Sequence, residues 1–302
     1  MSKLVRLCPS FLFRNARSVW LGTLASLVLT CLVSAAMAQT GATPPKPPSA
    51  NVPDLLKSNA VATCVDCDKP FDFPTHRELL EGLAGNQFVG ELRKALYTQD
   101  ILHQFESKAH FDNCHFEGAE AYLASLIYDA GKEADAALAA KNKADEAGSV
   151  AAAKRAFFAL GQALHAVQDF YAHSNYIELQ APKVKNPDDI VVIAPWRKAD
   201  QDTIATLRTQ GLVSGYVSWG FPKDCPAGTI SHHDLAKDSA DTVSGKRLVP
   251  HLTNLSLYRL AVFVARKASL QLMQEAFQRW PVLKEINGPN VAFEVMIDRR
   301  GV

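Results

Sequence analysis

Apolar residues recur at intervals of three and four over most of the chain beyond residue 74, which is the spacing of amphipathic helices. Four stretches show it: residues 75–96, with a break near Gly85, and residues 116–147, 150–179 and 252–280. Gly148 is expected to end the second stretch and Ser149 to cap the third. Two short apolar segments, residues 190–195 and 216–221, are expected to pair as a minor β-hairpin. The pattern predicts an all-α, multi-helix bundle.

The first 38 residues have a different character. Four cations, Lys3, Arg6, Arg14 and Arg17, precede an apolar run over residues 19–35, and Ala36-Met37-Ala38 follows. This order predicts a signal peptide cleaved before Gln39 and an exported protein, periplasmic or secreted. A retained membrane anchor is the alternative, because the run approaches the roughly 18–20 residues that span a bilayer. Residues 39–73 are expected to form a proline-rich tether with a Cys-x-x-Cys segment, and residues 74–302 the helical domain.

Charge argues against one class of partner. Loss of the four leader cations lowers the formal net charge from +1 to about −3, and no basic run remains. Binding to nucleic acid through phosphate neutralisation is therefore not indicated. The remaining chain of roughly 260 residues is long enough for one domain with a substantial core.

Four cysteines follow the leader: Cys64, Cys67, Cys114 and Cys225. An even number in an oxidising compartment predicts two disulfides. The Cys64-x-x-Cys67 spacing also leaves open a redox pair or half of a structural zinc site. A bond between Cys114 and Cys225 would hold the segment after His110 beside the segment before His232.

Candidate chemistry is concentrated in residues 164–176. His165, Asp169 and His173 are four residues apart, so they lie on one helical face with about 6 Å of rise between neighbours. The two histidines are about 12 Å apart along the axis and cannot bind one ion. Asp169 lies between them and can share one ion and bridge to a second. Gly161, on the same stripe, indicates the close approach of a chain or an ion. The alternative is a polar stripe whose histidines bind water or carbonyl groups.

Two other clusters offer the oxygen and nitrogen ligands that zinc binds. The first is residues 110–113, His-Phe-Asp-Asn, with Asp100 ten residues earlier. The second spans residues 231–239 and contains His232 and Asp238. For each, a loop that binds no metal is the alternative.

These segments carry a resemblance. Residues 156–169 (AFFALGQALHAVQD) resemble the central helix of bacterial zinc-dependent phospholipases C, which share an all-helical fold with zinc-dependent single-strand nucleases. Residues 109–113 and 75–76 look like two further metal segments of that family, in the same order. Residues 168–179 (QDFYAHSNYIEL) are similar to the signature of the fungal heterokaryon-incompatibility Het-C group and its bacterial relatives, and residues 237–239 echo another of its motifs.

The resemblance implies a bundle of the zinc-dependent phospholipase C type with two zinc ions and room for a third. The implied ligands are Asp100, His110, His165 and Asp169 for the first ion, His76 and Asp169 for the second, and His173, His232 and Asp238 for the third. Three features depart from the phospholipases. A tether replaces their N-terminal tryptophan ligand, His173 follows Asp169 by four residues rather than six, and no match exists for their His-x-x-x-Glu pair.

The function implied is hydrolysis of a phosphodiester, most directly of a phospholipid at a membrane surface, with Asp169 as the bridging carboxylate and Asp100 as a ligand or base. One alternative is a single-strand nuclease of the same fold. Another is a Het-C-like cell-death or interaction protein that binds metal but hydrolyses nothing. Five aromatic residues are expected to line a lipid groove or stack on bases: Phe111, Tyr171, Tyr176, Trp196 and Trp219.

Overall fold

The computed structural model describes residues 73–300. The predicted signal peptide or anchor, the Cys64-x-x-Cys67 segment and nearly all of the tether lie outside the described residues. Within residues 73–300 the chain forms eleven α-helices and one two-stranded sheet, so the all-α prediction is confirmed. The elements are α2 (Phe73–Leu79), α3 (Asn86–Leu102), α4 (Ser107–His110), α5 (Phe116–Asn142), α6 (Glu146–His173), α7 (Tyr176–Gln180), α8 (Lys198–Thr209), α9 (His232–Leu235), β1 (Leu248–Val249), β2 (Leu255–Ser256), α10 (Leu257–Arg279), α11 (Pro281–Asn287) and α12 (Val291–Arg300), with 3-10 turns at Ala181–Lys183 and Pro187–Asp189.

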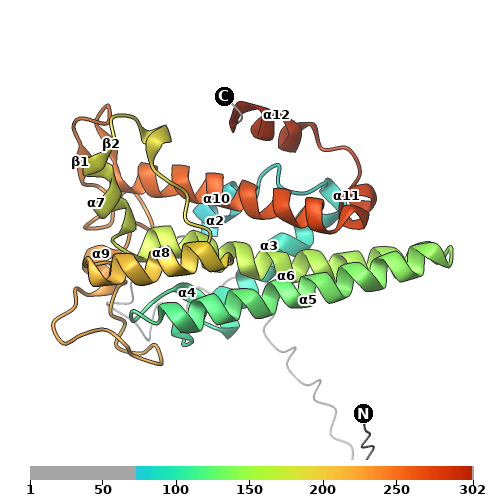
Figure 1. The fold of residues 1–302 in the computed structure, drawn as a ribbon, viewed down its shortest axis with the longest axis horizontal. Coiled ribbons are helices and arrows are strands. Elements are labelled where there is room, and N and C mark those ends of the chain that lie inside the picture. Colours follow the sequence, from blue (N-terminus) through green and yellow to red (C-terminus); the bar gives the residue numbers. More distant parts are fainter. Residues whose placement is uncertain (1–72, 301–302) are drawn as a thin grey trace, which may run out of the picture. The chain divides into compact units, whose positions relative to one another are not determined.

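Helix α6 is the centre of the described fold. It packs against α5, α3 and α10, and each residue from Ala163 to His173 is buried (Figure 1). A helix enclosed on all sides is expected to be apolar all round. Gln168 and the His165, Asp169 and His173 triplet break that expectation. Because buried polar groups need partners, these side chains must find them inside the protein.

The turn between α5 and α6 lies earlier in the chain than the sequence indicates, at residues 143–145. Ala144, with a φ of 59°, reverses the chain, and the side chain of Asp145 accepts a hydrogen bond from the Gly148 N–H at 2.9 Å. Asp145 is therefore the cap, and Gly148 lies in the first turn of α6. The prediction that Gly148 ends one helix and Ser149 caps the next is wrong. The Ser149 hydroxyl instead donates to the Ala137 carbonyl of α5 at 2.9 Å.

Three further boundaries differ from the prediction. Helix α6 ends at His173 because Ser174 is extended, so the predicted helix to residue 179 is divided into α6 and α7. The last long helix begins at Leu257, where Ser256 caps it, rather than at residue 252. Residues 190–195 and 216–221 do not pair; the hairpin is β1–β2. Residues 190–195 instead cover α6, and the Tyr171 hydroxyl donates to the Ile193 carbonyl at 2.6 Å.

Gly161 marks the point where α6 and α3 approach most tightly. A Cβ atom at Gly161 would lie 2.6 Å from the Ala95 Cβ and 2.9 Å from the Leu92 Cα. Such distances are too short for any side chain, so the glycine permits the contact. The expectation of a close neighbouring chain at this position is confirmed. The contact holds α3, and with it Asp100, against the face of α6 that carries His165.

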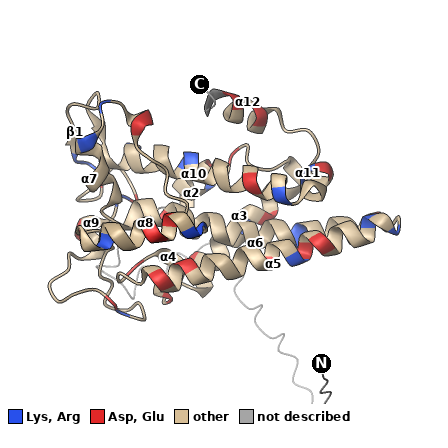
Figure 2. Ribbon diagram, viewed as in Figure 1, with Lys and Arg blue, Asp and Glu red and all other residues tan. Residues whose placement is uncertain are grey.

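Charged residues are mixed over the outer helices. Figure 2 shows Lys and Arg interspersed with Asp and Glu along α8 and α10 rather than gathered by sign. Among residues 73–300, no helix combines the length and the apolarity that crossing a membrane requires.

Candidate metal centre

Nine histidine and aspartate side chains converge around the C-terminal half of α6. All eight residues proposed from the sequence belong to the group, and Asp112, which follows α4, joins them. The eight are His76 from α2, Asp100 from α3, His110 from α4, three residues from α6 (His165, Asp169 and His173), His232 from α9, and Asp238 after α9. Each is at most 7% exposed. We call this group the His–Asp centre.

Asp100, His110 and Asp169 each place one atom close to His165 Nε2. His165 Nε2 lies 2.9 Å from Asp169 Oδ2, 3.2 Å from His110 Nδ1 and 3.4 Å from Asp100 Oδ1. His110 Nδ1 is also 2.9 Å from Asp169 Oδ2. His110, His165 and Asp169 have one ligand atom each within 4.8 Å of one another, and Asp100 forms a second such group with His165 and His76. Imidazole nitrogens and carboxylate oxygens are ligands that zinc takes. These four residues are the first set that the resemblance implies.

His76 faces the other oxygen of the Asp169 carboxylate. Its Nε2 atom lies 3.2 Å from Asp169 Oδ1, while its Nδ1 lies 2.6 Å from Gln168 Oε1. Gln168 in turn donates through Nε2 to the Ser269 hydroxyl at 3.0 Å. Since that bond fixes the amide oxygen toward His76, Nδ1 carries a proton and Nε2 is the ring atom that faces Asp169. Such outer hydrogen bonds orient histidine ligands of metals.

A third set lies at the end of α6. His173 Nε2 is 3.2 Å from Asp238 Oδ1 and 3.8 Å from Asp169 Oδ1. His232 Nε2 is 3.3 Å from Asp238 Oδ2. His173 Nδ1 donates to the His110 carbonyl at 2.8 Å, which leaves Nε2 as its ligand atom. The structure thus brings together the three residues that the resemblance implies for a third ion.

Asp112 is best placed to orient His232. His232 Nδ1 lies 2.9 Å from Asp112 Oδ1, so a proton on Nδ1 is shared with this carboxylate and Nε2 is left to face Asp238. Asp112, His173 and His232 also have one atom each within 4.8 Å of one another, the spacing of a metal site. We favour the orienting role because His173 Nδ1 is already committed to a carbonyl group.

The electrostatics of the centre favour a cation. Asp100, Asp112, Asp169 and Asp238 are buried together, and within residues 73–300 their ion-pair partners are histidines rather than lysine or arginine. Burial alone lowers the pKa of His173, but nearby Asp169, Asp112 and Asp238 outweigh it and raise that pKa to about 9. Burial raises the pKa of Asp238, but the charge of His173 lowers it to about 2. Positive charge, as protons or metal ions, must accompany these carboxyl groups.

Several donor atoms form no hydrogen bond although they are buried. In the described part of the chain they include both oxygens of Asp100, Asp169 Oδ1, His173 Nε2, Asp238 Oδ1, His110 Nε2 and His165 Nδ1. Orphaned buried polar atoms are rare and indicate a missing partner. Four of them, Asp100 Oδ1, Asp169 Oδ1, His173 Nε2 and Asp238 Oδ1, take part in the close contacts just described. Zinc fits this site in three respects: buried ligand atoms lack hydrogen bonds, the ligand types are imidazole nitrogen and carboxylate oxygen, and four carboxyl groups supply negative charge.

Strained backbone positions the ligands between α4 and α5. Phe111, Asn113 and Cys114 all have φ between 53° and 56°, which non-glycine residues seldom adopt. The buried Asn113 side chain holds this turn by accepting from the Val217 N–H at 2.8 Å and donating to the Ser107 hydroxyl at 2.9 Å. At Gly215 a Cβ atom would lie 2.5 Å from the His232 Cα, so only glycine lets His232 approach. Strain of this kind is found at functional sites.

The disulfide between Cys114 and Cys225 is present, with the two Cα atoms 4.8 Å apart. It joins the turn that carries His110 and Asp112 to the segment that precedes His232. Cys114→Ser is expected to cost about 4 kcal/mol of unfolding free energy, because the bond closes a loop of 111 residues in the unfolded chain. Urea denaturation of the variant and the oxidised wild type measures this, with the reduced wild type as the control. Equal stability of all three would contradict it.

Sequence reasoning missed the orienting residues and misplaced the aromatic ones. Asp112 was visible as part of residues 110–113 but not chosen, while Gln168 gave no signal beyond its position beside Asp169. Phe111, Tyr171 and Tyr176 are at most 1% exposed and belong to the core, so they cannot line a groove. Their rings pack around Phe170. Trp196 and Trp219 are partly exposed.

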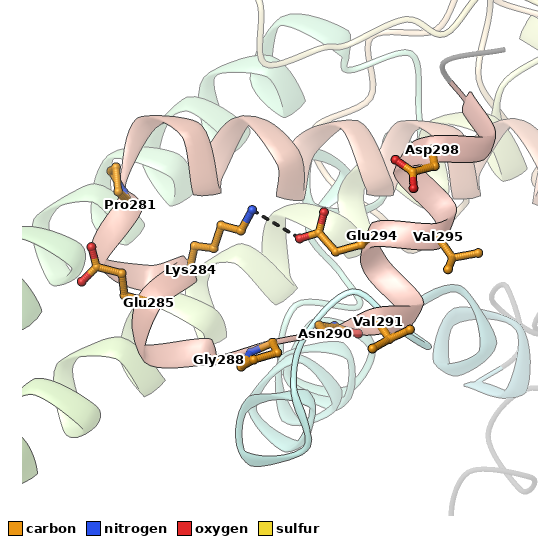
Figure 3. Close-up of a pocket in the computed structure, with 10 residues that line it drawn as sticks. Pro281, Lys284, Glu285, Gly288, Asn290, Val291, Glu294, Val295 and Asp298 are labelled. Atoms are coloured by element: carbon orange, nitrogen blue, oxygen red, sulfur yellow. Dashed lines mark ion pairs between the residues drawn. The ribbon is translucent and has the colours of Figure 1, made fainter.

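A separate surface hollow lies between α11 and α12 (Figure 3). Its lining includes aliphatic side chains and the Lys284–Glu294 ion pair, whose charged atoms are 3.3 Å apart. None of the nine residues of the His–Asp centre lines it. The candidate chemistry of the described residues therefore lies in the buried centre rather than in this hollow.

Comparison with known families gives a match over part of the chain. The model of the VWA7 N-terminal domain family matches residues 84–191. This stretch includes six of the nine residues of the His–Asp centre: Asp100, His110, Asp112, His165, Asp169 and His173. The chain is thus similar to that domain over α3 to α7, and the description of the family names no reaction. Searches of curated proteins and of solved structures found no match.

Proposed function

We propose that the protein is an exported, zinc-dependent phosphodiester hydrolase of the phospholipase C type. The observation that carries the proposal is the position of Asp169. One oxygen of its carboxylate faces His110 and His165, and the other faces His76. A carboxylate with different histidines at each oxygen is suited to bridge two metal ions, as the phospholipase C and Het-C resemblance implies.

Different residues of the centre would bind different metal ions. Asp100, His110, His165 and Asp169 would hold one zinc ion, and His76 with Asp169 a second; His173, His232 and Asp238 would hold a third. Bound zinc would supply Lewis acidity and lower the pKa of a bound water. Asp100 has two carboxylate oxygens without hydrogen bonds, so one remains to accept a proton from such a water. Asp112 and Gln168 would keep His232 and His76 in the ligand tautomer.

Apolar side chains beside the centre favour a lipid over a nucleic acid. Ile101 and Leu102 follow Asp100 in α3 and are 51% and 71% exposed. Phe105 and Phe221 are 56% and 63% exposed and lie on paired segments, since the Phe221 N–H donates to the Phe105 carbonyl. Lys223 Nζ lies 4.9 Å above the Phe221 ring. Exposed apolar residues beside a lysine fit the interface of a phospholipid membrane.

Burial supports a second candidate, a metal-binding domain without catalytic activity. Each residue of the centre is at most 7% exposed, so a substrate reaches it only if a covering segment moves. A Het-C-like cell-death or interaction protein would be such a domain, since it would bind metal without hydrolysing a substrate. A single-strand nuclease is less supported, because charges of both signs are mixed over the surface and Phe111, Tyr171 and Tyr176 are buried.

Elemental analysis joined to a phosphodiester panel tests the proposal. Protein without the leader is expected to hold two or three zinc ions per chain and to hydrolyse a phosphatidylcholine or a water-soluble phosphodiester, but not single-stranded DNA. Zinc with no hydrolysis would favour the non-catalytic domain. Absence of bound metal would overturn both, and cleavage of DNA alone would favour the nuclease.

The exposed apolar side chains give a second test. Phe105→Asp is expected to weaken binding to phosphatidylcholine vesicles at least tenfold, because a carboxylate cannot enter the apolar interface. Co-sedimentation of the protein with the vesicles measures this binding. Activity on a water-soluble phosphodiester should be unchanged. Tyr128→Asp is the matched control, since Tyr128 is 73% exposed on α5 and outside this group. Equal losses in both variants would contradict a role for Phe105.

A further inference from the structure

A lysine with no exposure lies directly beside the His–Asp centre. Lys237 is 0% exposed, and its Nζ atom donates to the Ser174 carbonyl at 2.8 Å, the Leu235 carbonyl at 3.1 Å and Glu178 Oε1 at 3.2 Å. An ammonium group has three protons, so the three acceptors use all of them. Lysine is almost never buried in this way unless its charge is paired.

Glu178 completes the arrangement. Its Oε1 atom also accepts from the Ser244 hydroxyl at 3.0 Å, while its Oε2 atom is buried and forms no hydrogen bond within the described residues. Glu178 belongs to α7 and Ser244 to the segment after Asp238. One ion pair therefore joins α7, the end of α6 and the chain that carries Asp238.

Two hydrogen bonds of Lys237 go to the residues on either side of His173, a candidate metal ligand. Its backbone N–H donates to the Ala172 carbonyl at 3.0 Å, and its ammonium group to the Ser174 carbonyl; these two residues flank His173. The next residue after Lys237 is Asp238, whose Oδ1 lies 3.2 Å from His173 Nε2. Lys237 is therefore bonded to the residues before and after His173, and these two bonds fix the position of the Asp238 carboxylate. The cation also sits at the C-terminal end of α6, where the helix dipole favours it.

We propose that Lys237, paired with Glu178, is a positioning residue that holds Asp238 against His173 and His232 and so sets the affinity of the third metal site. The inference rests on the proposed metal binding but concerns one site alone. Lys237 makes no contact with Asp100, His110 or His165 among the interactions of the described residues, so the first site does not depend on it.

Lys237→Met tests the proposal, because methionine fills the space of the stem but removes the charge and three donors. Metal content after dialysis against a graded chelator gives the number and affinity of bound ions, and cobalt absorption reports their coordination. The variant is expected to lose one ion per chain, or to bind it at least tenfold more weakly, with the others at wild-type affinity. Ser244→Ala is the matched control. It removes one bond to Glu178 but none to Lys237, so it should retain every ion.

Glu178→Gln provides a second measurement that does not alter the lysine. It keeps the shape of the side chain and removes its charge, so it is expected to weaken the same single ion by a smaller factor. Wild-type affinity for all ions in Lys237→Met would overturn the proposal. Loss of all ions together with helical content in both variants would also overturn it, since the role would then be structural. A wild-type protein that binds no metal would instead overturn the proposed function.

Discussion

Asp169→Asn is expected to abolish binding of at least two metal ions while the helical content of the protein stays nearly intact. Asp169 contacts His76 through one oxygen and His110 and His165 through the other. Asparagine keeps the shape but presents one neutral oxygen, and its amide nitrogen cannot bind a metal cation. Burial raises the pKa of Asp169, but the surrounding histidines lower it well below its usual value. The wild-type carboxylate is therefore charged at neutral pH and available to metal.

Elemental analysis, circular dichroism and phosphodiester hydrolysis measure the outcome together. Metal and activity should fall in parallel, and His165→Ala should rank next in severity because His165 contacts three other members of the centre. Asp135→Asn makes the same chemical change at an exposed position of α5 and should have no effect. His103→Ala, whose partner is Glu106 rather than the centre, should retain its metal. Full zinc content in Asp169→Asn would refute the bridging role.

The second large effect concerns pH. In the metal-free protein the pKa of His173 is about 9, above the 6.5 of an unfolded chain. Its protonated form therefore stabilises the fold fully below pH 6.5, and that stabilisation is lost as the pH rises through 9. Asp238 has a pKa of about 2, below the 3.8 of an unfolded chain. Its charge stabilises the fold above pH 3.8, and the contribution is lost as the pH falls through 2. Together they favour the metal-free fold most between about pH 4 and 6.5.

The stability that zinc adds to the fold is expected to grow as the pH rises, because a histidine ligand must lose its proton before it binds the metal. The zinc affinity of the third site is expected to rise about tenfold per pH unit between pH 6 and 8.5 for each proton displaced. Titration calorimetry in buffers of different ionisation enthalpy counts those protons, and thermal melts with and without zinc should separate further as the pH rises. An affinity that does not change over this range would contradict the assignment of His173 as a ligand.

Helical periodicity predicted the architecture of residues 73–300 well, because helix α6 and its neighbours are set by local apolar patterns. The errors are at positions where another contact prevailed. Asp145 rather than Ser149 is the cap because Ala144 adopts a left-handed conformation, which its position between Lys143 and Asp145 does not indicate. The apolar residues 190–195 resemble a strand in sequence, but Ile190, Ile193 and Ala194 are buried in the helical core, and the Ile193 carbonyl accepts from the Tyr171 hydroxyl.

The candidate ligands were predictable to different degrees for a physical reason. His165, Asp169 and His173 share one helix, so their relative position follows from its geometry. His232 and Asp238 reach the same place only through a long irregular segment held by the Cys114–Cys225 bond and Gly215. The orienting residues Asp112, Gln168 and Lys237 act through hydrogen bonds to residues far away in the sequence, and these partners are visible only in three dimensions.

The close contact at Gly161 would affect which ion the proposed metal centre prefers. The glycine lets α3 lie against α6, and Asp100 is carried on α3, so the spacing of these two helices fixes how far Asp100 Oδ1 lies from His165 Nε2, which is 3.4 Å. Zinc takes its ligands at about 2.0–2.2 Å, whereas calcium takes oxygens at about 2.3–2.6 Å and seeks more of them. A larger side chain at position 161 would push α3 away from α6 and lengthen this distance. Helix packing, as well as ligand type, would then influence which metal the proposed site holds.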